Sequence, residues 1–159
     1  MIIIGEKLNS TIPAIREAIE KEDVGTIADL AKKQYGAGAG FIDINAGMFA
    51  EEEPEKLVWM ARIVQEATGA PLSIDSPNPE AIRQVLEMNT NPKVMINSIT
   101  AEAKRFHDIL PLTTAYNTSV IALCMGDGGL PQTVLERMQI ADMLVDNLTK
   151  AGVKEGNIY

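Results

Sequence analysis

The sequence predicts an α/β fold built on a parallel sheet, and the distribution of apolar residues carries this prediction. Short apolar runs alternate with longer segments whose apolar residues recur at helical spacing. The short runs are continuously apolar, which is typical of strands buried on both faces in a parallel sheet covered by helices. A doubly wound open sheet and a (β/α)8 barrel both fit this pattern. No Gly-x-Gly-x-x-Gly motif follows the first run, which argues against the dinucleotide-binding form of the open sheet.

The predicted elements follow one another in strand–helix order. The strands are expected at residues 2–5, 41–45, 72–75, 94–97 and 120–124, and the helices at 13–21, 24–37, 54–68, 79–88, 101–116 and 131–150. Residues 157–159 are expected to begin a sixth strand. Because a complete barrel needs about 250 residues, the 159 residues predict the N-terminal portion, residues 1–159, of a single barrel domain. That portion would hold five βα units and the start of strand six.

Composition excludes several classes of function. The net charge of −8 argues against a nucleic-acid partner, which would need a basic face. The single cysteine excludes an internal disulfide framework and favours a reducing, cytoplasmic setting. The sequence contains neither a signal-peptide pattern nor an apolar run of membrane-spanning length. One histidine and one cysteine, far apart in sequence, do not suggest a metal site.

Polar residues lie where the predicted strands end. Asn9 follows the first strand, Asp43 and Asn45 end the second, Asp75 ends the third and Asn97 ends the fourth. Ligands of parallel α/β folds bind at this edge. The same residue types also turn a strand into a loop and cap the next helix, so a structural role is an open alternative at each position. An acid and an amide on neighbouring strands, as at Asp75 and Asn97, suit the amino-pyrimidinone edge of a flat heterocycle.

Four segments carry a family resemblance. They are residues 4–9 (Ile-Gly-Glu-Lys-Leu-Asn), 43–47 (Asp-Ile-Asn-Ala-Gly), 74–76 (Ile-Asp-Ser) and 95–98 (Met-Ile-Asn-Ser). In this order and at βα spacing, they resemble the pterin-binding methyltransferases that use 5-methyltetrahydrofolate. The methyltetrahydrofolate:corrinoid/iron–sulfur protein methyltransferases are the most similar group, and the folate domain of cobalamin-dependent methionine synthase is similar too. The resemblance spans the whole chain.

The resemblance implies a (β/α)8 TIM barrel that forms a homodimer and holds the pterin at the C-terminal edge of the strands. Asp75 and Asn97 match the acid and the amide that hydrogen-bond the pterin in this family, while Asn9, Asp43 and Asn45 match positions near the pocket. The implied reaction moves the N5-methyl group of 5-methyltetrahydrofolate to the cobalt of a corrinoid (cobalamin) carried by a partner protein, so this chain itself needs no metal. The family's polarising residues follow strands six and seven, so no catalytic residue is assigned within this sequence.

Other interpretations of the same pattern remain. Dihydropteroate synthase shares the implied fold, but it carries a Ser-Thr-Arg-Pro-type loop after the second strand, and residues 46–49 here are Ala-Gly-Met-Phe. An aldolase-type barrel would need a lysine at a strand end, and Lys7 and Lys93 are poor candidates. A truncated barrel that binds a pterin or a partner without turnover also stays open.

Overall fold

The strands follow one another across the sheet in sequence order. The computed structural model describes all 159 residues, which divide into two compact units, Met1–Met95 and Ile96–Tyr159. One five-stranded sheet runs in the order β1-β2-β3-β4-β5. This order confirms the predicted arrangement and excludes a doubly wound sheet, in which the first strand would lie in the middle.

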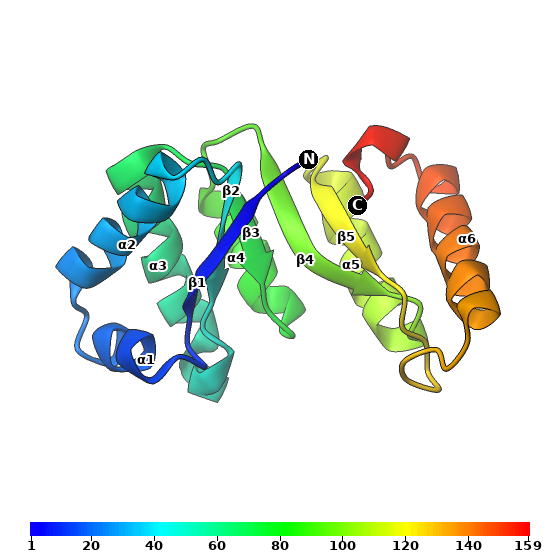
Figure 1. Cartoon of the computed structure of the whole chain (residues 1–159), viewed down its shortest axis with the longest axis horizontal. Helices are drawn as coiled ribbons and strands as arrows, with labels where there is room; N and C mark the ends of the chain where they lie inside the picture. Colours follow the sequence, from blue (N-terminus) through cyan, green and yellow to red (C-terminus); the bar gives the residue numbers. More distant parts are fainter. The chain divides into compact units, whose positions relative to one another are not determined.

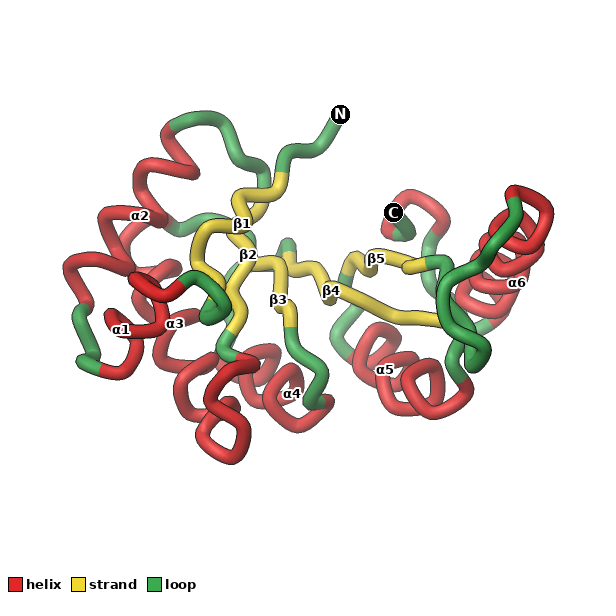
Figure 2. Tube along the Cα trace, turned by 60° about the horizontal axis from the view of Figure 1, so that its bottom comes forward, coloured by secondary structure: helices red, strands yellow, loops and turns green.

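The first unit consists of parallel strands covered by helices (Figure 1). Its strands are β1 (Ile4–Asn9), β2 (Phe41–Asn45) and β3 (Leu72–Asp75), and its helices are α1 (Pro13–Glu20), α2 (Val24–Gly36), α3 (Glu53–Thr68) and α4 (Pro79–Met88). A 3-10 helix, η1 (Gly47–Glu52), precedes α3. The four α-helices pack against β1, β2 and β3, and Figure 2 shows them on one side of these strands. The predicted βα units are therefore present.

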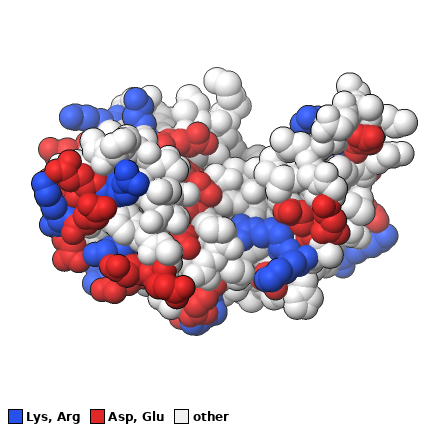
Figure 3. All heavy atoms as spheres, turned by 90° about the horizontal axis from the view of Figure 1, so that it is seen from below, with Lys and Arg blue, Asp and Glu red and all other residues white.

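The core of this unit is aliphatic. Ile42 and Ile44 of β2 and Leu72 and Ile74 of β3 are fully buried. Charged side chains lie on the outer faces of the helices, where both signs are interspersed at the left of Figure 3. This division between apolar and charged faces is the amphipathic pattern from which the helices were predicted.

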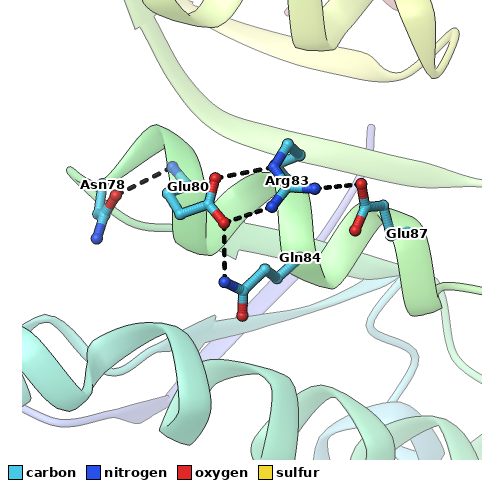
Figure 4. A network of polar contacts seen from close by, with 5 residues as sticks. All are labelled: Asn78, Glu80, Arg83, Gln84 and Glu87. Carbon is cyan, nitrogen blue, oxygen red and sulfur yellow. Dashed lines mark hydrogen bonds and ion pairs between the residues drawn. The ribbon is translucent and has the colours of Figure 1, made fainter.

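Helix α4 shows how local sequence signals start and stabilise a helix (Figure 4). The side chain of Asn78 accepts a hydrogen bond from the backbone N–H of Glu80 at 3.0 Å, which is an N-cap. Arg83 then forms ion pairs with Glu80 and Glu87, three residues before it and four after it. Hydrogen bonds from Arg83, and then from Gln84, lower the pKa of Glu80 from its ordinary 4.5 to about 2. The predicted bounds of this helix, 79–88, are confirmed.

The predicted position of the first strand was wrong. It was expected at residues 2–5, whereas β1 spans Ile4–Asn9. Ile2 and Ile3 are about half exposed, at 46% and 50%, and Leu8 is the fully buried residue of the strand. Pairing with β2 decides which residues belong to the strand, and an apolar run alone does not define that register. Asn9 is consequently the last residue of β1 and does not follow it.

An irregularity in β1 explains part of this difference. The register against β2 shifts between Gly5 and Leu8. Within the shift, the backbone N–H of Lys7 donates to Oε1 of Gln34 on α2 at 2.9 Å, in place of a partner on the neighbouring strand. A Cβ atom at Gly5 would lie only 2.8 Å from the same oxygen, so a larger residue there would push the Gln34 side chain away from this hydrogen bond.

The second unit continues the same alternation. Strand β4 (Val94–Thr100) begins in the first unit and continues into the second, which also contains α5 (Ala103–Ala115), β5 (Ser119–Leu123), α6 (Val134–Lys150) and the short 3-10 helix η2 (Glu155–Asn157). Helix α6 starts later than the predicted residue 131, because Thr133 and Glu136 form a capping box there. None of the helices combines the length and the apolar character that a membrane span requires.

The last residues begin to pair with β5. Ile158 forms a parallel bridge with Val120. The N–H of Tyr159 donates to the carbonyl oxygen of Val120 at 3.0 Å, and the N–H of Ala122 donates to the carbonyl oxygen of Tyr159 at 2.8 Å. The expected start of a sixth strand is therefore present as a single bridge with its flanking hydrogen bonds.

Candidate functional site

Three of the predicted site residues end neighbouring strands of the first unit. Asn9, Asn45 and Asp75 are the last residues of β1, β2 and β3, and each is partly exposed. The strand register places Asn9 opposite Asn45. Because parallel strands present their C-terminal ends at one edge of the sheet, the three side chains share that edge.

Asn45 is at the centre of the hydrogen bonds at this edge. Its Oδ1 accepts from the hydroxyl of Ser10 at 2.9 Å and from the backbone N–H of Gly47 at 3.0 Å. Its Nδ2 donates to Oδ2 of Asp75 at 2.9 Å. The amide therefore connects a loop on one side to a carboxylate on the other.

Ser10 is a site residue that the sequence did not reveal. It is fully buried, and its Oγ accepts a hydrogen bond from the backbone N–H of Met48 at 3.1 Å while donating to Asn45. Its own N–H donates to the backbone carbonyl of Asn45 at 3.0 Å. A serine directly after a strand is common in turns. Ser10 differs from an ordinary turn serine because its hydrogen-bond partners, Asn45 and Met48, are far away in sequence.

The amide oxygen of Asn9 binds the loop after β1. Its Oδ1 accepts from the backbone N–H of Thr11 at 2.9 Å and from the Thr11 hydroxyl at 2.7 Å. This arrangement, typical of an Asx-turn, shapes the connection from β1 to α1. The amide nitrogen is then the group that Asn9 can offer to a ligand.

Asp43 lies deeper than the other predicted residues. It is two positions before Asn45 on β2 and therefore on the same face of the strand. It is only 2% exposed, and its Oδ2 accepts from the hydroxyl of Ser73 at 2.6 Å. The hydrogen bond between Asp43 and Ser73 joins β2 to β3 inside the sheet. Direct contact between Asp43 and a ligand stays a prediction.

A second buried polar pair follows β3. The hydroxyl of Ser76 donates to Oε1 of Glu53, the first residue of α3, at 2.6 Å, and the same hydroxyl oxygen accepts from the N–H of Asn78 at 3.0 Å. Glu53 is 3% exposed. A glutamate in the first turn of a helix is a favourable charge there, and the sequence does not reveal its serine partner.

Asn97 belongs to the second unit and does not end its strand. The strand was predicted to stop at residue 97, whereas β4 continues to Thr100 because Ile99 and Thr100 are buried and extend it. Asn97 is partly exposed, and the peptide bond between Asn97 and Ser98 is cis. Its contribution to ligand binding stays a prediction.

Two further features concern ligands of other kinds. No group of three or more His, Cys, Asp or Glu side chains is arranged to hold a metal ion. The second unit also carries a groove of about 380 Å³ between α5 and α6, lined mainly by apolar side chains that include Phe106, Leu110 and Met143. Few polar groups converge in this groove, which distinguishes it from the edge formed by β1, β2 and β3.

A parallel α/β sheet in sequence order is typical of a barrel-type fold, and the amide and carboxylate side chains at the C-terminal ends of its strands form a candidate site. Comparison with known protein families identifies the family to which the chain belongs. The family described as "Pterin binding enzyme" matches residues 5–159, and the chain belongs to this family.

Known relatives agree with this assignment. The chain is 38% identical to methylcorrinoid:tetrahydrofolate methyltransferase of Eubacterium limosum over 161 residues, covering 100% of the chain and 59% of that protein. It is 26% identical to methionine synthase of Mycobacterium tuberculosis (strain ATCC 25618 / H37Rv) over 165 residues, covering 99% of the chain and 14% of that protein. The chain thus spans less than two thirds of the length of these relatives. The resemblance inferred from the four motifs is confirmed.

Solved structures confirm the fold. Dihydropteroate synthase from Xanthomonas albilineans in complex with 7,8-dihydropteroate superposes with a TM-score of 0.76 at 20% identity, covering 99% of this chain and 58% of that one. The 7,8-dihydropteroate synthase from Vibrio fischeri ES114 gives a TM-score of 0.73 at 18% identity, covering 99% and 60%. At this level of identity the likeness establishes the barrel-type fold and not the activity.

Proposed function

We propose that the protein with this sequence transfers a methyl group between 5-methyltetrahydrofolate and the cobalt of a corrinoid protein. The 38% identity to a methylcorrinoid:tetrahydrofolate methyltransferase over the whole chain supports this proposal. That relative's name gives the direction from corrinoid to folate, whereas the family resemblance of the four motifs implies the opposite direction. One site serves both directions, because a catalyst lowers the same barrier from either side.

The observation that carries the ligand assignment is the hydrogen bond of 2.9 Å between Nδ2 of Asn45 and Oδ2 of Asp75. It holds a carboxylate at the C-terminal edge of the sheet, where ligands of this fold bind. The amino-pyrimidinone edge of a pterin presents N–H donors, which a carboxylate accepts strongly. Asp75 therefore binds the pterin, and the amide nitrogen of Asn9 is an additional donor at the same edge.

The reaction requires that the site orient the folate. In the direction from folate to corrinoid, the electron pair of cobalt(I) attacks the methyl carbon, the bond from that carbon to N5 breaks, and N5 keeps the electron pair and takes up a proton. The corrinoid is a substrate that the partner protein brings. Asp75 fixes the pterin ring, so the methyl group points in one direction, and such orientation lowers the entropic part of the barrier. We assign the proton donor to none of the residues described above.

The partners and the location belong to the same proposal. The methyl acceptor or donor is a corrinoid protein, the enzyme is a cytoplasmic homodimer, and neither nucleic acid nor membrane takes part. The net charge of −8 and the single cysteine support the intracellular, non-nucleic-acid part of this proposal. The family assignment supports the pterin ligand.

Anaerobic spectroscopy tests the proposed activity. The full-length protein is mixed with 5-methyltetrahydrofolate and a corrinoid protein reduced to cobalt(I), and the corrinoid absorbance is followed while tetrahydrofolate is quantified. We expect methylcobalt and tetrahydrofolate to form in equal amounts, and the reverse reaction to run from methylcorrinoid. Failure to transfer methyl in either direction would overturn the proposal, and formation of dihydropteroate from a dihydropterin pyrophosphate and 4-aminobenzoic acid would then identify the alternative activity.

A further inference from the structure

We propose that Ser10 and Asn45 are positioning residues: the Ser10 hydroxyl fixes the orientation of the Asn45 amide, and the oriented amide holds the Asp75 carboxylate for the pterin. This inference rests on the proposed function, which assigns pterin binding to Asp75. Neither Ser10 nor Asn45 needs to touch the folate for this role.

The orientation of the amide follows from its neighbours. The backbone N–H of Gly47 can only donate, and it points at Oδ1 of Asn45 from 3.0 Å. A flipped amide would place its NH2 group against that N–H and its oxygen against Oδ2 of Asp75. Both contacts would be unfavourable, the first between two donors and the second between two acceptors.

Ser10 reinforces this orientation from a rigid place. Its hydroxyl donates to Oδ1 of Asn45 at 2.9 Å, and the N–H of Met48 donates to the same hydroxyl oxygen at 3.1 Å. The hydrogen bonds therefore run in one direction, from Met48 through Ser10 and Asn45 to Asp75. Ser10 is fully buried, so the two bonds that its hydroxyl makes are not readily exchanged for bonds to water.

The chain of hydrogen bonds also joins separate parts of the sequence. Ser10 and Asn45 are 35 positions apart, and Asn45 and Asp75 are 30 positions apart. A polar group held by bonds from several rigid elements loses little freedom when a ligand binds, which strengthens binding. The loop after β1 therefore acts on the carboxylate at the end of β3 without contacting it.

Two substitutions separate positioning from direct contact. Ser10→Ala removes one of the two donors to Asn45, and we expect it to weaken folate binding about three- to tenfold. Asn45→Asp keeps the shape and both acceptor contacts but replaces the donor to Asp75 with a second carboxylate. It should weaken binding by about tenfold or more, because like charges oppose each other and the hydrogen bond from Asn45 to Asp75 is lost.

The decisive experiment is a double-mutant cycle on the full-length protein, with calorimetric titration of 5-methyltetrahydrofolate into the wild type, Ser10→Ala, Asp75→Ala and the double variant. If Ser10 acts through Asp75, the Ser10→Ala loss seen in the wild-type background disappears in the Asp75→Ala background. Thr113→Ala is the matched control, because Thr113 is 1% exposed and its hydroxyl bonds within its own helix. That variant should lower the melting temperature without changing the folate affinity.

The outcomes distinguish the two proposals. Equal losses from Ser10→Ala in both backgrounds, or unchanged affinity in Ser10→Ala, would overturn the positioning role even when the wild type transfers methyl. Coupled losses in a protein that binds the folate but transfers no methyl would support the positioning role and overturn the proposed activity. A wild type that does not bind the folate would refute both.

Discussion

Replacing Asp75 with asparagine tests the ligand site with little disturbance of the fold. Asp75 is partly exposed at the end of β3 and accepts from Nδ2 of Asn45 at 2.9 Å. An asparagine side chain has nearly the same shape and can turn its carbonyl oxygen toward Asn45, which keeps that hydrogen bond. In the proposed complex its NH2 group then faces the N–H donors of the pterin, from which the carboxylate accepts, so two donors oppose each other.

The expected size of the effect follows from the charge of the lost acceptor. A hydrogen bond to a charged group contributes about 1.5–3 kcal/mol, and each 1.4 kcal/mol corresponds to about a tenfold change in affinity. Asp75→Asn should therefore weaken 5-methyltetrahydrofolate binding roughly ten- to hundredfold. Asp75→Ala should lose as much affinity and should also lower the melting temperature, because Asn45 then loses its acceptor.

Calorimetric titration of the full-length variant, paired with a thermal melt, measures both quantities. The expected result is a weaker dissociation constant at a melting temperature close to that of the wild type. A structural role for Asp75 predicts the opposite: a lowered melting temperature with the wild-type affinity in the folded fraction. Unchanged affinity in Asp75→Asn would refute the assignment of this carboxylate to the pterin.

Three further predictions concern other parts of the chain. Asn97→Ala should weaken folate binding roughly ten- to hundredfold with little change in the melt, and an unchanged dissociation constant would remove Asn97 from the site. Ile42→Ala should destabilise the fold by about 2–5 kcal/mol, read from the urea midpoint, because Ile42 is fully buried in β2; an unshifted midpoint would contradict this. Glu80 has its pKa lowered from 4.5 to about 2 by Arg83, so its contribution to stability is present above pH 4.5 and is lost as the pH falls toward 2. The melting temperatures of the wild type and Glu80→Gln should differ above pH 4.5 and converge near pH 2, and a difference that persists at pH 2 would contradict the assignment.

The alternation of strands and helices was predictable because short-range sequence patterns indicate where each element lies. Helix α4 starts with an asparagine cap and a proline, and its predicted bounds agree with the structure. Strand bounds depend on partners far away in sequence. The exposed Ile2 and Ile3 precede β1, and a side chain from α2 interrupts the pairing within that strand. Neither feature leaves a periodic signal in the sequence.

The candidate site was predictable to the same extent. Asn9, Asn45 and Asp75 could be placed at one edge because parallel strands all end there. The hydrogen-bonding role of each residue could not be predicted, since it depends on which atom of each amide meets which partner. Ser10 was missed because its role comes from contacts with residues 35 and 38 positions away. Asp43 was correctly placed on the strand, but its burial against Ser73 emerges only from the packed sheet.

The hydrogen bonds from the first two residues of η1 provide a reporter of the site that needs no ligand. Met48 is half exposed, and amides in such connections ordinarily exchange their protons with water quickly. Here the amides of Gly47 and Met48 donate to the side chains of Asn45 and Ser10. Their exchange in heavy water is therefore slowed only while these side chains keep the orientation described above. Magnetic resonance or mass spectrometry can thus follow the assembly of this edge in the free protein, before any folate or corrinoid is added.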